Sequence, residues 1–149
     1  MVRRAPEAAV DAGDDAQGLI LSFDTKRVSG KPDVIAPDGS EVRILCGTGR
    51  GSMAQFSLPP GAVSKAVAHR TVEEVWYVVS GSGRMWRQLE GREEITELAP
   101  GLSISIPVGT HFQFRCDGTA ALVAVGTTMP PWPGDGEAYL VEGKWPPTA

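Results

Sequence analysis

Cysteine is scarce in this sequence, with Cys46 and Cys116 the only two among 149 residues. They are too few and too far apart to predict a disulfide framework or a zinc knuckle, and we expect both to be small, buried apolar residues. Independence from disulfides is typical of a reducing compartment, so we expect a cytoplasmic protein. No apolar run approaches the ~20 residues that cross a bilayer, and no apolar signal-peptide core follows the N-terminal Met-Val-Arg-Arg.

An excess of positive charge is also missing. The formal net charge is −4, from 18 acidic and 14 basic residues. Nothing in this balance draws the chain to nucleic acid or to an anionic membrane, so we expect partners of neither kind. The length predicts one domain, and the 42% of hydrophobic and 21% of charged residues are those of an ordinary globular protein.

Amphipathic helical periodicity is absent, whereas 18 glycines and 12 prolines divide the chain into short segments. This pattern predicts nine or ten strands joined by turns, as in an all-β sandwich or barrel. We expect one hairpin at residues 34–45, around an Asp-Gly turn, and a second at residues 72–89, whose first strand is the strongest of the chain. Further strands are expected at residues 18–23, 52–58, 95–98, 102–106, 111–115 and 120–125.

Composition divides the chain into three parts. Residues 1–17 are rich in Ala, Asp and Gly without periodicity, as in a flexible tail. Residues 18–128 carry the strand pattern and are predicted to form the barrel. In residues 129–149 proline is frequent and disfavours interior strands and helices, so we expect an extension that packs on the barrel through Tyr139 and Trp145.

Several catalytic motifs are absent as well. There is no Gly-x-Ser-x-Gly nucleophile turn, no phosphate-binding loop and no Gly-x-Gly-x-x-Gly between a strand and a helix. Polar chemistry is instead concentrated between His69 and Gly83, around the strongest strand. Alternate residues of a strand share a face, so Glu74 and Trp76 are expected inside and Glu73 at the surface. A carboxylate on an apolar face must be paired or protonated.

This stretch resembles the first motif of the cupin superfamily, whose members are small double-stranded β-helix barrels of the jelly-roll type. The motif reads Gly, five residues, His-x-His, three or four residues, Glu, six residues, Gly. Val67 stands here in place of the first histidine. The matching positions are Gly61, His69, Glu74 and Gly81.

A second cupin motif reads Gly, five residues, Pro-x-Gly, two residues, His. Gly101, Pro107 and Gly109 match it, but His111 lies one place early and Phe112 occupies the histidine position. The resemblance covers roughly residues 40–128 and implies an all-β jelly-roll barrel.

The resemblance implies a metal site of three histidines and one glutamate, of which a strict alignment keeps only His69 and Glu74. A third donor depends on strand register, because a one-residue slip reverses the faces of a strand. In the family register Phe112 points inward and His111 and Gln113 point outward; if the turn is one residue shorter, His111 and Gln113 point inward. In that case His69, Glu74 and His111 would form a three-ligand site for one divalent ion, such as Zn, Fe, Mn or Ni. Otherwise the barrel holds no metal.

Five further side chains are candidates for contact with a substrate. Trp76 and Trp86 could line a pocket for an apolar or ring-shaped ligand, although aromatic residues more often fill a core. Gln113 could add a hydrogen bond if it points inward. Gln55 and Lys65 are candidates for the mouth of the barrel.

By resemblance to small single-domain cupins, we expect an enzyme with isomerase, epimerase, cyclase or lyase chemistry on a carbonyl-containing metabolite. A metal would polarise the carbonyl or enolate oxygen; without one, His69 or His111 would move a proton while Glu74 orients it. Two alternatives stay open: a non-catalytic ligand-binding or sensory cupin, favoured by Val67, and a structural protein whose aromatic residues pack the barrel solid. Open edge strands need covering, so a homodimer is expected.

Overall fold

The computed structural model describes residues 22–149, which contain eleven strands and no helix. The tail predicted at residues 1–17, and all but the last two residues of the strand predicted at 18–23, lie outside the described residues. No helix in the described part of the chain is long and apolar enough to span a membrane. The strands are β1 (Val34–Ile35), β2 (Glu41–Gly47), β3 (Ser52–Leu58), β4 (Val67–His69), β5 (Glu73–Ser80), β6 (Gly83–Leu89), β7 (Arg92–Leu98), β8 (Ser103–Ile106), β9 (His111–Cys116), β10 (Leu122–Met129) and β11 (Ala138–Leu140).

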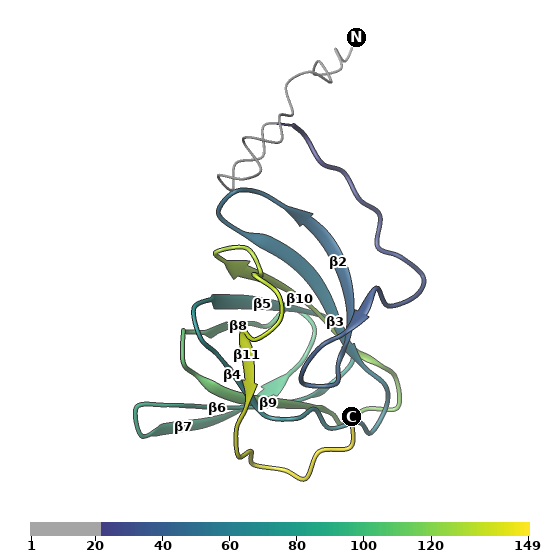
Figure 1. The fold of residues 1–149 in the computed structure, drawn as a ribbon. Coiled ribbons are helices and arrows are strands. Elements are labelled where there is room, and N and C mark those ends of the chain that lie inside the picture. The colour runs from purple at the N-terminus through teal and green to yellow at the C-terminus, as the bar shows by residue number, and fades with distance from the viewer. Residues whose placement is uncertain (1–21) are drawn as a thin grey trace.

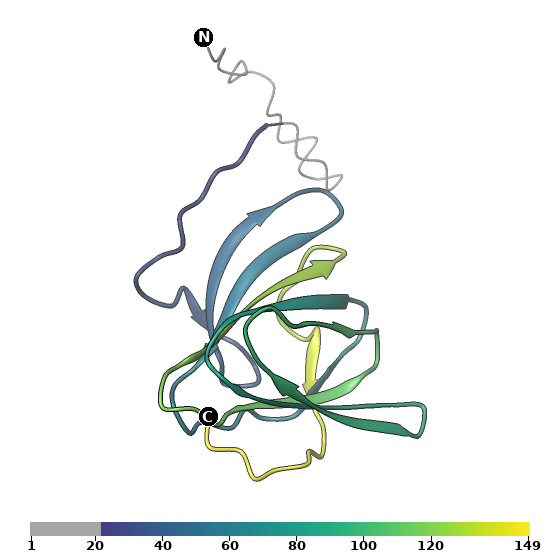
Figure 2. The ribbon, with the colours of Figure 1, turned by 180° about the vertical axis from the view of Figure 1, so that it is seen from behind.

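Two antiparallel sheets face each other and enclose the core (Figures 1 and 2). One has six strands in the order β1-β2-β3-β10-β5-β8, and the other has five in the order β11-β4-β9-β6-β7. The all-β jelly-roll prediction is therefore confirmed. The β6–β7 hairpin projects from the body of the barrel in both views.

The predicted hairpin at residues 34–45 forms, with Val34 opposite Val42. The predicted hairpin at residues 72–89 is wrong, because β5 pairs with β10 and β8 whereas β6 pairs with β9 and β7. The glycines between β5 and β6 carry the chain from one sheet to the other. A Cβ on Gly81 would lie 2.4 Å from the carbonyl oxygen of Ala121, and one on Gly83 would lie 1.9 Å from that of Arg115. These glycines serve close backbone approach rather than a tight hairpin turn.

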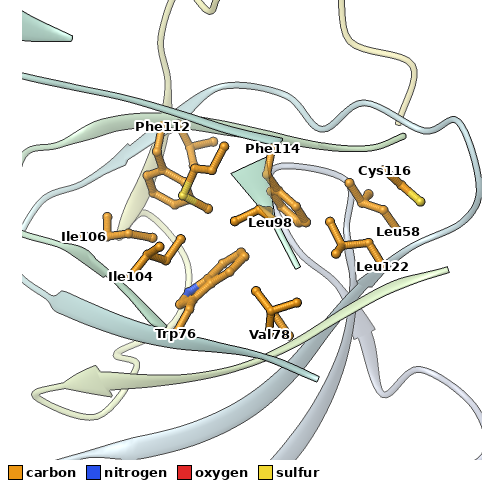
Figure 3. Packing of buried hydrophobic residues seen from close by; sticks show 13 residues of the cluster. Leu58, Trp76, Val78, Leu98, Ile104, Ile106, Phe112, Phe114, Cys116 and Leu122 are labelled. Atoms are coloured by element: carbon orange, nitrogen blue, oxygen red, sulfur yellow. The ribbon is translucent and has the colours of Figure 1, made fainter. Parts of the chain in front are cut away.

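The core lies between the inner faces of the two sheets. Strand β5 alternates between exposed and buried residues, and its buried Trp76 and Val78 face Phe112 and Phe114 of β9 (Figure 3). The rings of Trp76 and Phe114 meet edge to face with centroids 5.0 Å apart. Such packing of large apolar side chains is the main stabilising contribution in a barrel of this size.

The C-terminal segment runs along the outside of the five-stranded sheet (Figure 1). Strand β11 pairs with β4 at the sheet edge, with Tyr139 opposite Ala68. Beyond it, the fully buried side chain of Gln113 binds the backbone of the segment: its Oε1 accepts from the amides of Lys144 and Trp145, and its Nε2 donates to the carbonyl of Trp145. Strand β11 and the buried amide of Gln113 thus fasten the proline-rich segment to the barrel, together with backbone hydrogen bonds such as those from the amides of Val141 and Thr148.

Candidate functional site

A cavity of about 600 Å³ opens into the barrel between the two sheets. Its walls come from strands β1 to β5 and β9 to β11, from the β1–β2 turn and from the segment between β10 and β11. This volume is in the range that holds a small metabolite. The polar residues that line it are Asp38, Ser52, His69, Glu74, Thr128 and Asp135, and its aromatic residues other than histidine are Phe56, Trp76, Phe112 and Trp132.

His69 ends β4 and lines the cavity with only 6% of its surface exposed. Its ring meets Phe112 and Trp132 edge to face, at centroid distances of 5.3 and 5.0 Å. Nδ1 is buried and has no hydrogen-bond partner among the described residues. Burial lowers the pKa of the imidazole to about 4, against a smaller opposing effect of the Glu137 charge, so His69 is neutral at physiological pH.

Glu74 lies on the inner face of β5 and is 3% exposed, as the alternation of the strand requires. Its Oε2 accepts a hydrogen bond of 2.6 Å from Nε1 of Trp76. Burial raises the pKa of the carboxyl group to about 7; the bond from Trp76 opposes this rise and the charge of Asp38 adds to it. Near neutral pH the group is therefore present in both its protonated and its ionised form.

His69 and Glu74 face each other inside the cavity. Nδ1 of His69 lies 3.7 Å from Oε1 of Glu74, which is longer than a hydrogen bond. Their pKa values, about 4 and about 7, mean that between these two pH values both groups are mainly neutral. His69 and Glu74 are thus in contact as neutral groups, and the carboxyl group of Glu74 titrates near pH 7. The two side chains do not form a salt bridge.

The register of β9 follows the family pattern, with Phe112 pointing inward. Phe112 pairs with Val67 of β4, is 2% exposed and lies in the core, whereas His111 pairs with Gln88 and takes no part in the cavity. A hydrogen bond from the amide of Thr110 to the carbonyl of Pro107 closes the turn before β9. This turn is not one residue shorter than in the family pattern, and its length sets the register. The three-ligand site of His69, Glu74 and His111 is therefore a wrong prediction.

The donors that remain do not fit the metal site implied by the family. Val67 and Phe112 fill the positions of two histidines, which leaves His69 and Glu74 as the family's donors in the barrel. No group of three or more His, Cys, Asp or Glu side chains within residues 22–149 is arranged to hold a metal ion. We accordingly derive no reaction step through a metal.

Among the predicted substrate contacts, only Trp76 lines the cavity. Gln113 and Trp86 lie opposite each other on the outer face of the five-stranded sheet, because the register of β9 turns both away from the barrel. Gln113 binds the C-terminal segment there, and Nε1 of Trp86 donates to Glu93. Gln55 and Lys65 do not line the cavity either: Gln55 alternates with the inward Phe56 on β3, and Lys65 is exposed.

Three cavity features were missed in the sequence. Asp38 belongs to the turn before β2, where the Asp-Gly pair signalled only a turn; it is 7% exposed, and burial raises the pKa of its carboxyl group. Trp132 comes from the proline-rich segment and packs on His69. Gly126 lies opposite Trp76, and a Cβ there would lie 2.9 Å from Oε2 of Glu74. A glycine inside an apolar strand was the one available signal, since it often marks close approach.

Glu137 holds the backbone between His69 and Glu74. Its buried carboxylate accepts hydrogen bonds from the hydroxyl and amide of Thr71 and, at 2.8 Å, from the amide of Val72. Burial opposes ionisation of Glu137, but these hydrogen bonds together keep its pKa below the ordinary value. The C-terminal segment therefore helps to position both groups of the site.

Fold and cavity together define a double-stranded β-helix barrel with a ligand-sized interior. The family model described as "Cupin domain" matches residues 54–127. The chain belongs to the cupin superfamily.

Several solved structures share this fold. The capsular polysaccharide assembling protein CapF from Staphylococcus aureus is 23% identical with a TM-score of 0.60, over 72% of this chain and 33% of CapF. An uncharacterized conserved protein with a double-stranded β-helix domain from Klebsiella pneumoniae is 16% identical with a TM-score of 0.58, over 80% of this chain and 91% of that one. A recombinant oxalate oxidase in complex with glycolate is 21% identical with a TM-score of 0.62, over 74% of this chain and 61% of the oxidase.

This chain thus spans only a third of CapF and less than two thirds of the oxidase. At such identities these likenesses show the fold alone. A comparison with curated proteins finds none that matches.

Proposed function

We propose that this cupin is a small-molecule enzyme that transfers a proton on a carbonyl-containing metabolite inside the barrel, with isomerase, epimerase, cyclase or lyase chemistry. The observation that carries the proposal is Glu74, a buried carboxyl group with a pKa of about 7 in a ligand-sized cavity. A general acid–base group works best when its pKa lies near the operating pH. A strongly perturbed carboxyl group in a cleft is a candidate for this task.

In the proposed step the ionised Glu74 removes a proton from the carbon next to the carbonyl and returns it to another atom of the ligand. Oε2 stays bound to Trp76, so Oε1 is the oxygen available to the ligand. His69 is neutral and lies beside Oε1, where it can exchange a hydrogen bond with Glu74 as the charge of the carboxyl group changes.

Exchange of carbon-bound protons in D₂O tests this step. A panel of small neutral and amine-bearing ketones is incubated with the protein, and deuterium incorporation beside the carbonyl is followed by NMR. We expect the parent protein to catalyse exchange on part of the panel and Glu74→Gln to abolish it. Glu73→Gln is the matched control, because Glu73 precedes Glu74 and points to solvent. Equal exchange by the parent and Glu74→Gln would overturn the proposal.

A second candidate is a ligand-binding or sensory cupin without turnover. The observation that favours it is the replacement of two family ligands by Val67 and Phe112, both buried in the core. The same panel separates the two functions. A ketone that binds in the cavity, as seen by saturation-transfer NMR, but shows no deuterium incorporation supports the binding protein.

We also propose that the protein forms a homodimer through the outer face of the six-stranded sheet. Val75, Tyr77 and Val79 of β5 are 47%, 54% and 47% exposed in one row, beside Val125 of β10. A contiguous apolar patch of this kind is typical of an interface. Analytical ultracentrifugation should give a dimer for the parent and a monomer for Tyr77→Lys, whereas Ile95→Lys on the other sheet should stay dimeric.

We propose that the protein works in a reducing compartment such as the cytoplasm. Cys46 and Cys116 are both free thiols in the described part of the chain, which fits such a compartment. Thiol labelling of the protein in its native cells checks this assignment, and an oxidised pair would contradict it.

A further inference from the structure

Acidic side chains line the cavity, and they outnumber its basic ones. Its lining includes the carboxyl groups of Asp38, Glu74 and Asp135, and His69, which is neutral near pH 7. No lysine or arginine is among the lining residues in the part of the chain that the structure describes. A site for phosphates or carboxylates needs cationic groups of this kind. The lining therefore disfavours anionic ligands and leaves neutral and cationic ones.

Asp38 is the carboxylate best placed to select between these two classes. Its Oδ1 accepts from the amide and hydroxyl of Ser40, at 2.9 and 2.6 Å, which holds the side chain in the β1–β2 turn. Within residues 22–149 it forms no ion pair, and Oδ2 accepts no hydrogen bond. Lys65 lies nearby, with its amide donating to the carbonyl of Asp38, but its side chain is exposed. Burial raises the pKa of Asp38 by more than its bonds with Ser40 and the charge of Lys65 lower it, so a ligand cation beside Asp38 would favour the ionised form.

Aromatic side chains line the same cavity as Asp38. Phe56 and Trp76 both line the cavity, and their rings stack with centroids 5.0 Å apart and an interplanar angle of 13°. We call this stacked pair the Phe56–Trp76 wall. Trp132 lines the cavity beside His69. Aromatic faces attract cations, and a set of aromatic side chains is a recurring way to bind an ammonium group. The buried Nδ1 of His69 independently points to a polar ligand, because it lines the same cavity and has no hydrogen-bond partner within residues 22–149.

We propose that the cavity binds a ligand that bears a protonated amine, with the ammonium group beside Asp38 and the remainder of the molecule against the Phe56–Trp76 wall. This inference rests on the function proposed above, because it names the substrate class of the same cavity. In that setting, the carbonyl-containing metabolite is an amine-bearing one. Asp38 binds the ligand, and Glu74 acts on it.

Three probes that share one ring test the proposal: benzylamine, benzyl alcohol and benzoate, titrated at pH 7 by ligand-observed NMR. We expect the parent to bind benzylamine about tenfold more tightly than benzyl alcohol, and benzoate most weakly. Asp38→Asn keeps the acceptor for Ser40 but loses the charge, so it should bind benzylamine and benzyl alcohol equally. Glu97→Gln is the charge-matched control, since Glu97 is exposed on β7 outside the cavity. It should keep the preference of the parent.

The proposal is overturned if benzoate or benzyl alcohol binds the parent as tightly as benzylamine, or if benzylamine does not bind at millimolar concentration. It is also overturned if Asp38→Asn folds and keeps the preference for the amine. The rank order of the parent decides the matter if Asp38→Asn does not fold, which thermal unfolding would reveal. A preference for the amine without deuterium exchange on any ketone leaves the ligand class standing and removes the proposed proton transfer. Deuterium exchange without a preference for the amine leaves the proposed proton transfer standing and removes the ligand class.

Discussion

Nδ1 of His69 and Oε1 of Glu74 face each other at 3.7 Å inside the barrel, and burial shifts their pKa values in opposite directions. The imidazole holds its proton less well than in water, with a pKa of about 4, and the carboxyl group holds its proton better, with a pKa of about 7. Burial disfavours the charged form of either group, which explains both shifts. The two groups therefore oppose each other in the pH dependence of stability.

The first prediction concerns this opposition. Unfolded Glu74 loses its proton near pH 4.5 and folded Glu74 near pH 7, so its contribution to stability falls as the pH rises through this window. Unfolded His69 gains a proton below about pH 6.5 and folded His69 below about pH 4, so its contribution rises with pH between these values. In Glu74→Gln only the contribution of His69 remains, so stability should rise with pH relative to the parent. In His69→Gln only the contribution of Glu74 remains, so stability should fall with pH relative to the parent. Each slope difference from the parent should be on the order of 1 kcal/mol per pH unit.

Urea denaturation between pH 4.5 and 6.5 measures these slopes. Differences from the parent remove the titrations that all three proteins share, such as those of Asp38 and Glu137. Slope differences of opposite sign for Glu74→Gln and His69→Gln are expected. Three parallel curves would show that neither pKa is shifted by folding.

The second prediction concerns Gly126. A Cβ at this position would lie 2.7 Å from a ring carbon of Phe56 and 2.9 Å from both Oε2 of Glu74 and a ring carbon of Trp76. Gly126→Ala should destabilise the protein by about 1–3 kcal/mol through overpacking. It should also break the hydrogen bond from Nε1 of Trp76 to Oε2 of Glu74. The free energy of unfolding and the indole NH resonance of Trp76 report the two effects. Gly30→Ala is the matched control, because nothing lies within 4 Å of its Cβ position; equal effects of the two substitutions would contradict the prediction.

The third prediction restores a metal site. Val67 and Phe112 are paired across β4 and β9 at the two positions where the family places histidines. The double substitution Val67→His and Phe112→His, added to His69 and Glu74, should supply the four-ligand set of the family. Calorimetric titration with Zn²⁺ should show at least about tenfold tighter binding than in the parent. The same double substitution combined with Glu74→Gln should bind Zn²⁺ more weakly. If the parent already binds Zn²⁺ as tightly as the double variant, the conclusion that the parent lacks the family's metal ligands is wrong.

The fourth prediction concerns the C-terminal segment. Gln113→Leu removes the side-chain oxygen that accepts from the amides of Lys144 and Trp145 and the side-chain nitrogen that donates to the carbonyl of Trp145. Backbone groups of the C-terminal segment are then left unpaired. The expected loss of stability is on the order of 3 kcal/mol, with faster proteolysis at residues 141–149. Gln88→Leu, on the same outer face of the neighbouring strand, serves as the control. Unchanged stability and proteolysis in Gln113→Leu would show that the segment is held by other contacts.

Much of the fold could be predicted from residue patterns. Alternation in β5 placed Glu74 and Trp76 inside and Glu73 outside, and the structure confirms this. The glycine and proline pattern predicted a sandwich or barrel, and the resemblance of two motifs to the cupin family implied the jelly roll. The hairpin between β5 and β6 could not be judged in this way, because a glycine turn within a sheet and a glycine crossing between sheets have the same local sequence.

The candidate site was less accessible from the sequence. His69 and Glu74 were found, because the four residues between them match the spacing of the motif. Asp38 and Trp132 come from a turn and a proline-rich segment whose local sequence indicates no function, and only long-range pairing brings them to the same cavity. The direction of His111 depended on one residue of register, which the pairing of Phe112 with Val67 decides.

The sequence by itself determined the fold class, the inward face of β5 and the two polar groups that this motif contributes. It could do so because strand alternation and turn chemistry are local properties. Tertiary structure alone decided which residues join those two groups. Burial inside the closed barrel shifts both pKa values, the register of β9 replaces a metal ligand by Phe112, and the β1–β2 turn adds Asp38. Each of these depends on contacts between segments far apart in the chain, which no local pattern records.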